Sequence, residues 1–594
     1  MSEPIPQGDP GAWSELGELP ELVNMAGFLV ARAKEDPDAL AIRVARTDDS
    51  APEGVAFDDT TYGELEFHSG TLAMALSFAG LNPGDRVSIF VKPGVELIAI
   101  TFALLRIGAV PVLIDPGMGM KSVLSCVERM APKAFIGIPL AHVLRRLKPS
   151  AFRSVKLDFV AGGPGSGLIS RLTPALSLER LLADSTTKNR PLLETARDAE
   201  AAVLFTSGST GPAKGVTYTH GMFEAQVRAL KQTYGMGPGE IDVACLPVFA
   251  LFSPALGMTC VFPELDPSKP ATCDPAKLAG AIRASGATTT FGSPAIWRRV
   301  VPHCLAEGKD LPTLRRVLVA GAPVPADLIA DFKRLLPPGA DVHTPYGATE
   351  SLPVSSLSGA ELLEESDGAL RRAAESGAGT VVGRPVAGID LRLIRITDDP
   401  IESWSDDLEV APGELGEIVV RGPVVTAEYK FEPLHTGAAK IAVDPEHAHH
   451  KGEVWHRIGD VGRLDAAGRL WFHGRKSHRL ETPDGLVMPV PIENVFNTHP
   501  DVFRSALVGV GEPGEELQVL VVQPVEGRFP KGTPAGADLA ASLFEHVAGN
   551  LACDGVGRIL FHRDFPVDVR HNAKIDRREL RGWASTQMAE VATR

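Results

Sequence analysis

Leu204-Phe-Thr-Ser-Gly-Ser-Thr-Gly-Pro-Ala-Lys-Gly215 is the stretch of this sequence that most narrows its fold and chemistry. An apolar strand end leads into a loop of glycines and hydroxyls, which can turn backbone amides and side-chain donors towards an anion, and Lys214 adds charge. The loop departs from the Walker A pattern because Gly215, not Ser or Thr, follows Lys214. We therefore predict a phosphate-binding loop outside the P-loop NTPase class. Its candidate residues are Thr206, Ser207, Gly208, Ser209, Thr210, Gly211 and Lys214.

Helical and β patterns alternate on the N-terminal side of this loop. Thr61 and Glu64 have the spacing of a capping box, and the helix that they predict ends near Gly80. The alternation continues with a strand at 86–91, a helix at 95–106 and a strand at 110–114. After the loop, short β-prone runs at 287–291, 314–320 and 341–345 lead into helices or loops rich in Gly and Pro. The pattern indicates a parallel α/β architecture, in which ligands bind at strand ends.

From Gly413 onward the sequence pattern changes to short strands and turns. Examples are 417–421 and 470–472, which predict a barrel or meander. Beyond Arg475 the pattern is that of a smaller α+β unit, with strands at 506–510 and 518–523 and a helix at 538–551. We expect a large N-terminal domain over 1–474, of parallel-type sheets, helices and a distorted β-barrel, followed by a small α+β domain over 475–594. The segment 357–378 is interpreted as a solvated helical insertion.

Composition limits the partners of the protein. With 59 Lys and Arg against 74 Asp and Glu, the formal net charge of -15 offers no attraction to nucleic acid or anionic lipid. Six cysteines without a Cys-x-x-Cys pair fit neither a disulfide scaffold nor a zinc site. The N-terminus lacks a secretory pattern, and Pro247 and Pro254 argue against a membrane span over 243–262. We expect a soluble, cytoplasmic protein with a small-molecule substrate and no transmembrane segment.

Four further motifs follow the phosphate loop in order. They are Tyr346-Gly-Ala-Thr-Glu350, Gly459-Asp460, Gly474-Arg475 and Asn572-Ala-Lys574. With the loop, they resemble the superfamily of acyl-CoA synthetases, peptide-synthetase adenylation domains and luciferases, all of which form adenylates. The resemblance covers nearly the whole chain. It implies that ATP and Mg²⁺ are used and that the small C-terminal domain is a mobile lid.

The resemblance also assigns roles to individual residues. Tyr346 and Gly347 would lie at adenine, Thr349 would contact the α-phosphate, and Glu350 would bind Mg²⁺, a cation that prefers carboxylate oxygens. Asp460 would accept both ribose hydroxyls, since a carboxylate can accept two donors side by side, with Arg475 in support. The tripeptide Gly321, Ala322 and Pro323 would lie along the adenine or substrate wall. Lys574 would follow negative charge as the acid attacks the α-phosphate. The candidate catalytic residues are Lys574, Thr349 and Glu350.

Two positions depart from the pattern of acyl-CoA synthetases. Ala250 stands where an aromatic-His pair is common, and His478 stands at the hinge where Asp or Lys is common. Both positions relate to thioester formation, which weakens CoA as acceptor. The motif variants look most like the branch that includes the β-lactone synthetases of bacterial long-chain olefin biosynthesis. That resemblance implies a 2-alkyl-3-hydroxy fatty acid, whose carboxylate is adenylated and whose 3-hydroxyl then attacks the acyl carbon.

Ring closure requires an acceptor for the hydroxyl proton, and His571 and His478 are the candidate bases. The apolar run Phe249, Ala250, Leu251 and Phe252 is a candidate wall for alkyl chains. The histidines at 447, 449 and 450 are interpreted as part of a solvated loop. A complex with other enzymes of the same pathway is compatible with so apolar a substrate. Three alternatives remain open: an acyl-CoA or acyl-carrier ligase, a nucleotide-binding regulator without turnover, and luciferase-like oxidation.

Overall fold

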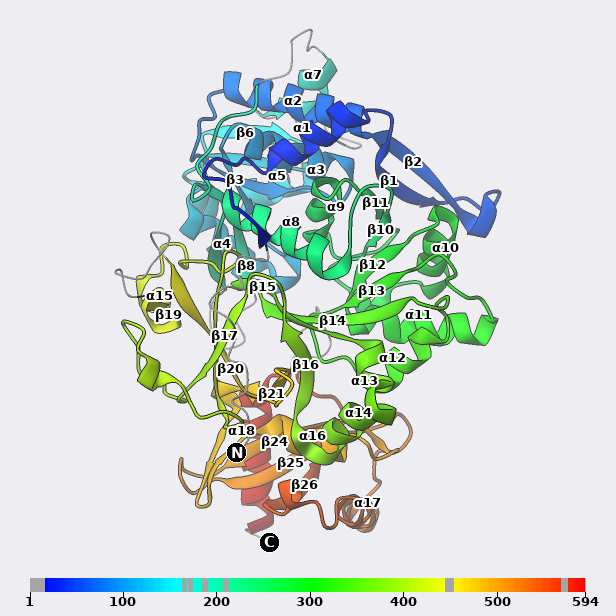
Figure 1. The fold of residues 1–594 in the computed structure, drawn as a ribbon, viewed down its shortest axis with the longest axis vertical. Helices are drawn as coiled ribbons and strands as arrows, with labels where there is room; N and C mark the ends of the chain where they lie inside the picture. The colour runs from blue at the N-terminus through cyan, green and yellow to red at the C-terminus, as the bar shows by residue number, and fades with distance from the viewer. Residues whose placement is uncertain are drawn as a thin grey trace.

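The structure is a computed structural model, and it describes residues 16–162, 168, 175–183, 191–206, 213–443, 453–567 and 575–592. Most of the chain forms a large upper part, and the elements after residue 475 gather below it (Figure 1). The large part contains two sheets with helices packed around them, and the small part contains two smaller sheets, one of two strands and one of three. The α/β plus α+β fold predicted from the sequence is confirmed.

A seven-stranded sheet carries the phosphate-loop motif near its edge. Its order is β7 (Leu176–Ser177), β6 (Leu157–Val160), β5 (Ala134–Gly137), β3 (Arg86–Phe90), β4 (Val110–Leu113), β8 (Glu200–Thr206) and β9 (Lys214–Thr219). The strands from β7 to β8 are parallel, whereas β8 and β9 are antiparallel. The predicted strands at 86–91 and 110–114 are thus present, and β8 ends within the motif.

The helices beside this sheet follow the sequence pattern closely. Thr61 caps α2 (Tyr62–Phe78), and Thr61 and Glu64 exchange the two hydrogen bonds of a capping box. The predicted helix at 95–106 is α3 (Val95–Arg106). The other helices of this region are α1 (Ala26–Glu35), α4 (Met120–Met130), α5 (Pro139–Leu147), α7 (Leu178–Ala183) and α8 (His220–Tyr234).

A fourteen-stranded sheet forms the rest of the large part. Its order is β17 (Asp390–Ile394), β18 (Gly416–Arg421), β20 (Val454–Leu464), β21 (Leu470–Arg475), β16 (Thr380–Pro385), β15 (Ser351–Ser358), β14 (Asp341–Ala348), β13 (Arg316–Val319), β12 (Thr289–Gly292), β10 (Ile241–Ala244), β11 (Thr259–Phe262), β1 (Leu40–Thr47) and β2 (Val55–Thr61), with β19 (Lys440–Ala442) beside β20. The strands from β1 through β14 along this path are parallel. The short strands predicted after Gly413 continue the same sheet through antiparallel pairs.

The helices of this second region are α9 (Phe252–Ala255), α10 (Pro275–Ser285), α11 (Pro294–Glu307), α12 (Ala326–Lys333), α13 (Gly359–Leu363), α14 (Ala369–Ala373) and α15 (Pro433–Ala439). The sequence predicts one helical insertion over 357–378, but its first two residues belong to β15 and the remainder is broken into several short helices, including α13 and α14. The left-handed backbone of Asp367 and Gly368 separates α13 from α14, because an α-helix cannot continue through positive φ. For the run 243–262 the sequence predicts a buried strand, a loop and a helix; the structure has the end of β10, a short helix at 252–255 and then a further strand, β11, at 259–262.

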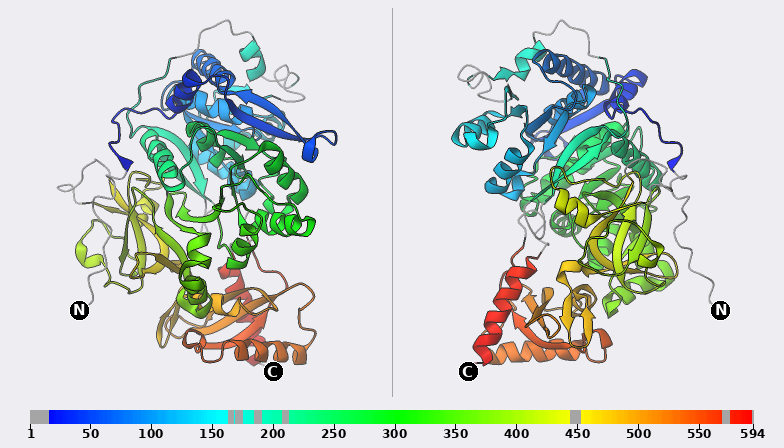
Figure 2. Two further views of the ribbon diagram at one scale, coloured as in Figure 1. Left: turned by 45° about the vertical axis from the view of Figure 1, so that its right-hand side comes forward. Right: turned by 90° about the vertical axis from the view of Figure 1, so that its left-hand side faces the viewer.

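The small part contains β22 (Leu480–Thr482), β23 (Gly485–Val487), β24 (Val502–Val510), β25 (Leu517–Pro524), β26 (Val556–Phe561), α16 (Pro489–Phe496), α17 (Thr533–His546) and α18 (Arg577–Ala592). Two apolar clusters fill it, one around Phe496 and one under α18. Figure 2 shows α18 running along one side of the small part. The helix predicted over 538–551 begins earlier, at Thr533, because Pro534 favours the first turn of a helix. The predicted boundary at 475 coincides with the end of β21.

All six cysteines are free and buried, as expected of core thiols. Within the described ranges, none of the helices combines the length and the apolar character needed to cross a membrane.

Candidate nucleotide and acyl site

The phosphate-loop motif closes a hairpin between two antiparallel strands. Thr206 and Lys214 are register partners at the ends of β8 and β9. Residues 207–212, which include Ser207, Gly208, Ser209, Thr210 and Gly211, and the side chain of Thr206 lie outside the described part. The described end of the hairpin places the ammonium of Lys214 4.9 Å from the ring centroid of Tyr429. The motif therefore faces the loop that carries Tyr429, which the sequence analysis did not identify.

Tyr346, Asp460 and Arg475 come together from three strands. The Tyr346 hydroxyl, at the end of β14, donates to Oδ2 of Asp460 at 2.5 Å. Arg475 is the register partner of Asp460 across β20 and β21, and its Nε lies 3.1 Å from Oδ1. Sequence reasoning named all three residues, and the sheet explains how segments more than 100 residues apart meet.

Asp460 is the polar centre of this group. Its side chain is 4% exposed, and burial raises its pKa, while Arg475 and the Tyr346 hydroxyl oppose that rise. Burial and the Asp460 carboxylate in turn raise the pKa of Tyr346, so its hydroxyl stays protonated and remains a donor. Oδ1 has an ion pair with Arg475 but no well-aligned hydrogen bond within the described part. A buried oxygen in that state is suited to accept ligand hydroxyls.

Glu350 is held at the turn between β14 and β15. The Tyr429 hydroxyl donates to its Oε1 at 2.7 Å, and its backbone carbonyl accepts the Thr426 N–H at 2.9 Å. Its second carboxylate oxygen has no hydrogen-bond partner among the described residues. Those residues also contain no cluster of three or more His, Cys, Asp and Glu side chains that could hold a metal by themselves. One open carboxylate fits Mg²⁺, which usually binds one or two carboxylates together with substrate phosphates.

Lys440 is a buried cation beside this carboxylate, and sequence reasoning missed it. Its side chain donates to the Thr426 carbonyl and, at 3.1 Å, to Thr426 Oγ1. Its ammonium lies 5.9 Å from the ring centroid of Tyr429, on which Lys214 also packs. Burial lowers the pKa of Lys440 to about 7, against the attraction of Glu350. Burial and Lys440 also lower the pKa of the buried His456 well below its usual value. The only sequence signal was a lone lysine in the apolar run 438–443.

The remaining nucleotide candidates lie on neighbouring strand ends. Tyr218 donates through its hydroxyl to the backbone carbonyl of Thr349. Gly347 is required by packing, because a Cβ there would lie 2.7 Å from the Ser351 carbonyl oxygen. Gly321, Ala322 and Pro323 follow β13, which neighbours β14. The parallel strands thus bring the tripeptide and the Tyr346 motif to the same edge of the sheet.

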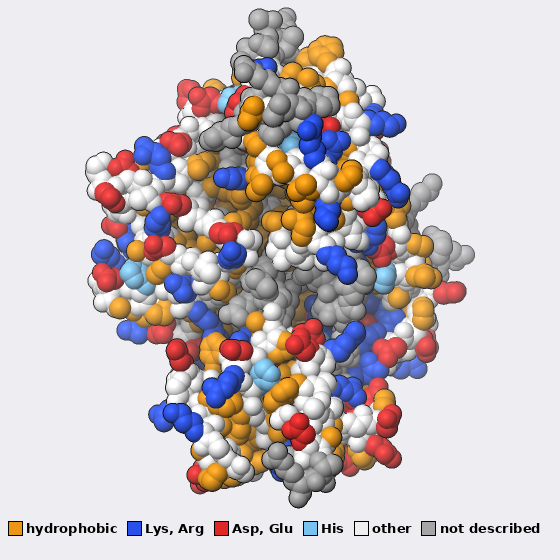
Figure 3. Space-filling view, turned by 180° about the vertical axis from the view of Figure 1, so that it is seen from behind, with side chains coloured by type: hydrophobic (Ala, Val, Ile, Leu, Met, Phe, Trp, Pro, Cys, Tyr) orange, Lys and Arg blue, Asp and Glu red, His pale blue; other side chains and the backbone are white. Residues whose placement is uncertain are grey.

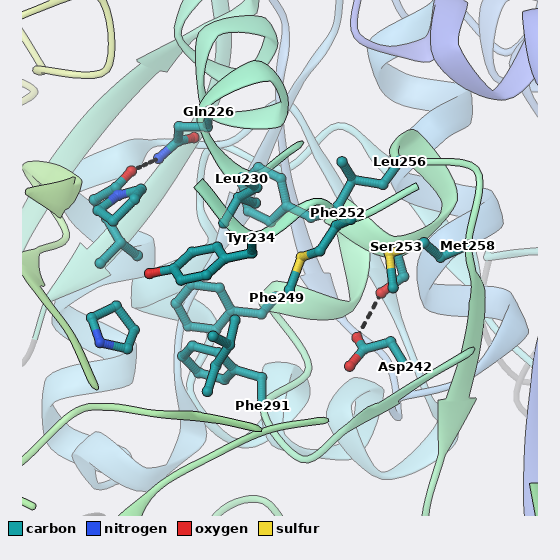
Figure 4. Close-up of a pocket in the computed structure, with 15 residues that line it drawn as sticks. Gln226, Leu230, Tyr234, Asp242, Phe249, Phe252, Ser253, Leu256, Met258 and Phe291 are labelled. Carbon is teal, nitrogen blue, oxygen red and sulfur yellow. Dashed lines mark hydrogen bonds between the residues drawn. The ribbon is translucent and has the colours of Figure 1, made fainter. Parts of the chain in front are cut away.

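An apolar cavity of about 60 Å³ lies beside the Tyr346–Glu350 motif. Pro345 borders it from one side of the motif, and Leu352 and Pro353 border it from the other. The side chains that surround it include Phe249, Phe252 and Phe291 (Figure 4). Its polar lining consists of Gln226, Tyr234, Asp242 and Ser253. This position fits an acid whose carboxylate lies at the motif and whose chain enters the cavity.

The four predicted wall residues do not all line the same cavity. Phe249 and Phe252 line the large cavity, and their ring centroids are 6.5 Å apart. Leu251 and Phe252 line a second apolar cavity of about 10 Å³. Ala250 is fully buried and lines neither cavity. The short turn 249–252 therefore forms a partition between two apolar spaces, which the sequence did not indicate.

The structure describes only one of the two candidate bases, His478. His571 and Lys574 lie outside the described residues, as do the histidines at 447, 449 and 450. His478 follows β21, and burial together with Arg577 and Arg475 lowers its pKa to about 3. Its imidazole is thus neutral near pH 7 but weakly basic in this arrangement. Seen from behind, acidic and basic side chains gather along the border between the large and small parts (Figure 3).

Known proteins resemble this chain over most of its length. A model of the family described as "AMP-binding enzyme" matches residues 29–430. An olefin β-lactone synthetase of Xanthomonas campestris pv. campestris is 42% identical over 573 residues, covering 96% of this chain and 99% of the relative. A protein of the same name from Stenotrophomonas maltophilia is 44% identical over 575 residues, with 96% and 99% covered.

A solved structure supports the fold. The anthranilate CoA ligase AuaEII in complex with anthranoyl-AMP superimposes with a TM-score of 0.75 at 18% identity. The match covers 97% of this chain and 99% of that one. At that identity the likeness concerns the fold alone.

Proposed function

This chain belongs to the AMP-binding enzyme family, and we propose that it activates a 2-alkyl-3-hydroxy fatty acid with ATP and closes it to a β-lactone. One observation carries the proposal. The polar group of Tyr346, Asp460 and Arg475 and the apolar cavity border the same β14–β15 motif, from Pro345 to Pro353. An acid bound there has its carboxylate next to the nucleotide and its chains in an apolar space. The sequence likeness to two β-lactone synthetases supports the choice of acid.

In the first step, a carboxylate oxygen of the acid attacks the α-phosphorus of ATP, and pyrophosphate leaves. The chain contributes position and charge rather than a covalent nucleophile. Asp460 accepts the ribose hydroxyls, and Lys574 stabilises the charge that develops between acid and phosphate. Mg²⁺, held by Glu350 and the phosphates, would supply charge neutralisation at the leaving pyrophosphate.

In the second step, the substrate's own 3-hydroxyl oxygen attacks the acyl carbon. The bond from that carbon to the AMP oxygen breaks, a four-membered ring closes, and the hydroxyl proton passes to a base. The nucleophile is tethered two carbons from the acyl carbon, so no second binding site is required. His571 and His478 remain the proposed bases, and the low pKa of His478 favours His571. A cytoplasmic location and a mobile domain over 475–594 are part of the same proposal.

The test is mass spectrometry of products after incubation with ATP, Mg²⁺ and a racemic 2-alkyl-3-hydroxy fatty acid, with and without CoA. We expect AMP and a product lighter than the acid by one water, independent of CoA. A matched acid without the 3-hydroxyl should release pyrophosphate yet give no lactone. An acyl-CoA that appears only with the thiol would instead establish the alternative function, an acyl-CoA ligase.

A further inference from the structure

The side chain of Gln226 lines the apolar cavity beside the Tyr346–Glu350 motif and carries a buried oxygen atom. The residue belongs to α8 and is 2% exposed. Among the residues that the structure describes, none donates a hydrogen bond to its Oε1. An acceptor in this state is unfavourable, because burial has removed the water that would otherwise bond to it. A ligand that donates a hydrogen bond inside the cavity would satisfy this oxygen.

Two neighbours fix which end of the Gln226 amide is the oxygen. Nε2 donates to the Leu352 carbonyl at 2.9 Å, and a carbonyl can only accept. The amide also donates to the hydroxyl oxygen of Tyr218, whose single proton is already donated to the Thr349 carbonyl. Both amide hydrogens thus have partners, and Oε1 remains as an acceptor for a ligand.

Gln226 lies at the end of the cavity where the motif is. Gln226, Leu230 and Tyr234 follow one another at intervals of four residues, so their side chains share one face of α8 (Figure 4). On this face Gln226 bonds to Leu352, near the start of β15. The Tyr234 hydroxyl donates to Ser356 Oγ at 3.0 Å, four residues further along that strand. An acid whose carboxylate lies at the motif therefore has its first carbons beside Gln226.

The other polar side chains that line this cavity are already paired. Ser253 donates to Oδ2 of Asp242 at 2.7 Å, and Tyr234 donates to Ser356 as described above. Within the described part of the chain, Gln226 is the lining residue that combines a buried oxygen without a partner and a direct bond to the motif.

From this geometry we propose that Gln226 recognises the 3-hydroxyl of the substrate, which donates a hydrogen bond to Oε1 while the carboxylate is activated. The hydroxyl-bearing carbon is two carbons from the carboxylate oxygens' own carbon, so a carboxylate at the motif places the hydroxyl at the same end of the cavity. This inference rests on the proposed function, because only a 3-hydroxy acid carries the donor at that point.

The hydroxyl has a single proton, and this determines the role of Gln226. During adenylation no base is required, so the proton is available for the bond to Oε1. During ring closure the proton passes to the base, and the bond to Oε1 is given up. Gln226 therefore selects the hydroxyl and holds it near the acyl carbon, and it takes no proton itself.

The experiment uses the full-length chain, ATP, Mg²⁺ and two matched acids, a 2-alkyl-3-hydroxy acid and the same 2-alkyl acid without the hydroxyl. Pyrophosphate from the first turnover is followed at subsaturating acid with a pyrophosphatase present, so that ring closure does not enter the second-order rate constant. The ratio of the two rate constants is taken within one preparation, and any loss of folded enzyme therefore cancels.

In the wild type, the 3-hydroxy acid should react about tenfold faster than the acid without the hydroxyl, because the latter leaves a buried acceptor unpaired. Gln226→Met keeps the length of the side chain and removes the amide, so the ratio should fall to unity or below. Gln226→Asn, which withdraws the amide by one carbon, is the second variant and should lower the ratio as well.

The matched control is Tyr234→Phe, which removes a hydroxyl from the same face of α8 that is already bonded to Ser356. It should change both rate constants by the same factor and keep the wild-type ratio. A purely structural role of Gln226, through its bond to Leu352, would likewise slow both acids alike and leave the ratio intact.

A ratio of unity in the wild type, or a wild-type ratio in Gln226→Met, would overturn the assignment. An equal fall of the ratio in Tyr234→Phe would do the same. The proposed function has a separate readout in the same data. If the wild type released no pyrophosphate with either acid, the proposed function itself would be wrong. If it made pyrophosphate and lactone while the ratio ignored Gln226, only the recognition of the hydroxyl would be wrong.

Discussion

The two halves of the candidate site are held by different forces. On the nucleotide side, Tyr346 and Arg475 converge on one buried carboxylate, Asp460, through directed polar contacts. On the acyl side, Phe249 and Phe252 meet through ring contacts around two small cavities. Directed contacts fail when one atom is changed, whereas an apolar space changes in proportion to its volume. Changes on the nucleotide side should therefore affect every acid alike, and changes on the acyl side should depend on the acid.

The largest loss is expected from Lys574→Ala. Removing a cation that acts on charge developed in the transition state typically lowers the rate by about 10²–10³-fold. The loss should appear in single-turnover formation of the acyl-adenylate, with the same factor for acids of every chain length and with ATP binding retained. Lys531→Ala, at an exposed lysine of the same C-terminal region, is the matched control. A loss that varied with chain length would break the comparison between the two halves.

Asp460→Asn should have the next largest effect. The amide keeps the shape but loses the charge that pairs with Arg475 and accepts ribose hydroxyls, so the KM for ATP should rise about 100-fold. The matched control is Asp390→Asn, because Asp390 is equally buried and pairs with Arg421 at 3.2 Å in the neighbouring strand. The control should lower stability and leave the KM for ATP near its wild-type value. An unchanged KM in Asp460→Asn would remove Asp460 from the nucleotide site.

The two predictions above concern residues that the sequence identified. They could be identified because short runs of neighbouring residues encode the motifs that contain them. A capping box at Thr61 and a helix at 95–106 are encoded by neighbouring residues, and the structure contains both. The motifs around Tyr346 and Asp460 are likewise short strings whose order along the chain is diagnostic. Their meeting requires only that the strands pair as α/β sheets usually do.

Tyr429 and Lys440 were not predictable in this way. Tyr429 reaches Glu350 across 79 residues of sequence, and nothing near Glu350 specifies which aromatic residue will arrive there. Lys440 resembles an ordinary strand-edge lysine until β19 pairs with β20 and buries it. The partition at Phe252 depends on ring contacts between two separate segments, α8 with Phe223 and the turn 249–252. Tertiary packing determines all three, and the next two predictions test the first two.

The buried Lys440 should make stability depend on pH. Its pKa is about 7 in the folded protein and about 10.4 in an unfolded chain. Between these values the unfolded state binds the extra proton, so stability rises with pH. The groups that face Lys440 are Glu350, His456 and Lys214. From pH 7 to pH 9, the wild type should gain about 2 kcal/mol relative to Lys440→Met.

Urea unfolding at the two pH values measures this difference, since the other titrating groups are common to both proteins and largely cancel. Lys231→Met, at an exposed lysine near the end of α8, should show no pH-dependent difference from the wild type. If Lys440→Met and the wild type kept a constant difference from pH 7 to pH 9, the lysine would not be titrating in that range.

The smallest effect is expected from Tyr429→Phe. This variant tests whether the nucleotide side depends on individual directed hydrogen bonds. The variant keeps the ring between Lys214 and Lys440 and removes only the hydroxyl that donates to Glu350. One such bond contributes about 1 kcal/mol, so the Mg²⁺ concentration for half-maximal pyrophosphate release should rise about fivefold. The matched control is Tyr62→Phe, which removes a buried hydroxyl bonded at 2.8 Å to the Met258 carbonyl, away from the nucleotide.

The direction of that change separates two roles for the hydroxyl. If it orients the Glu350 carboxylate, its loss weakens the metal and the Mg²⁺ requirement rises, for short and long acids alike. If it competes with the metal for the same oxygen, its loss strengthens binding and the requirement falls. The open second oxygen of Glu350 favours orientation, because the metal need not displace the hydroxyl to bind. If the Mg²⁺ requirement changed with the acid, the Tyr429 hydroxyl would act on both the nucleotide side and the acyl side of the site.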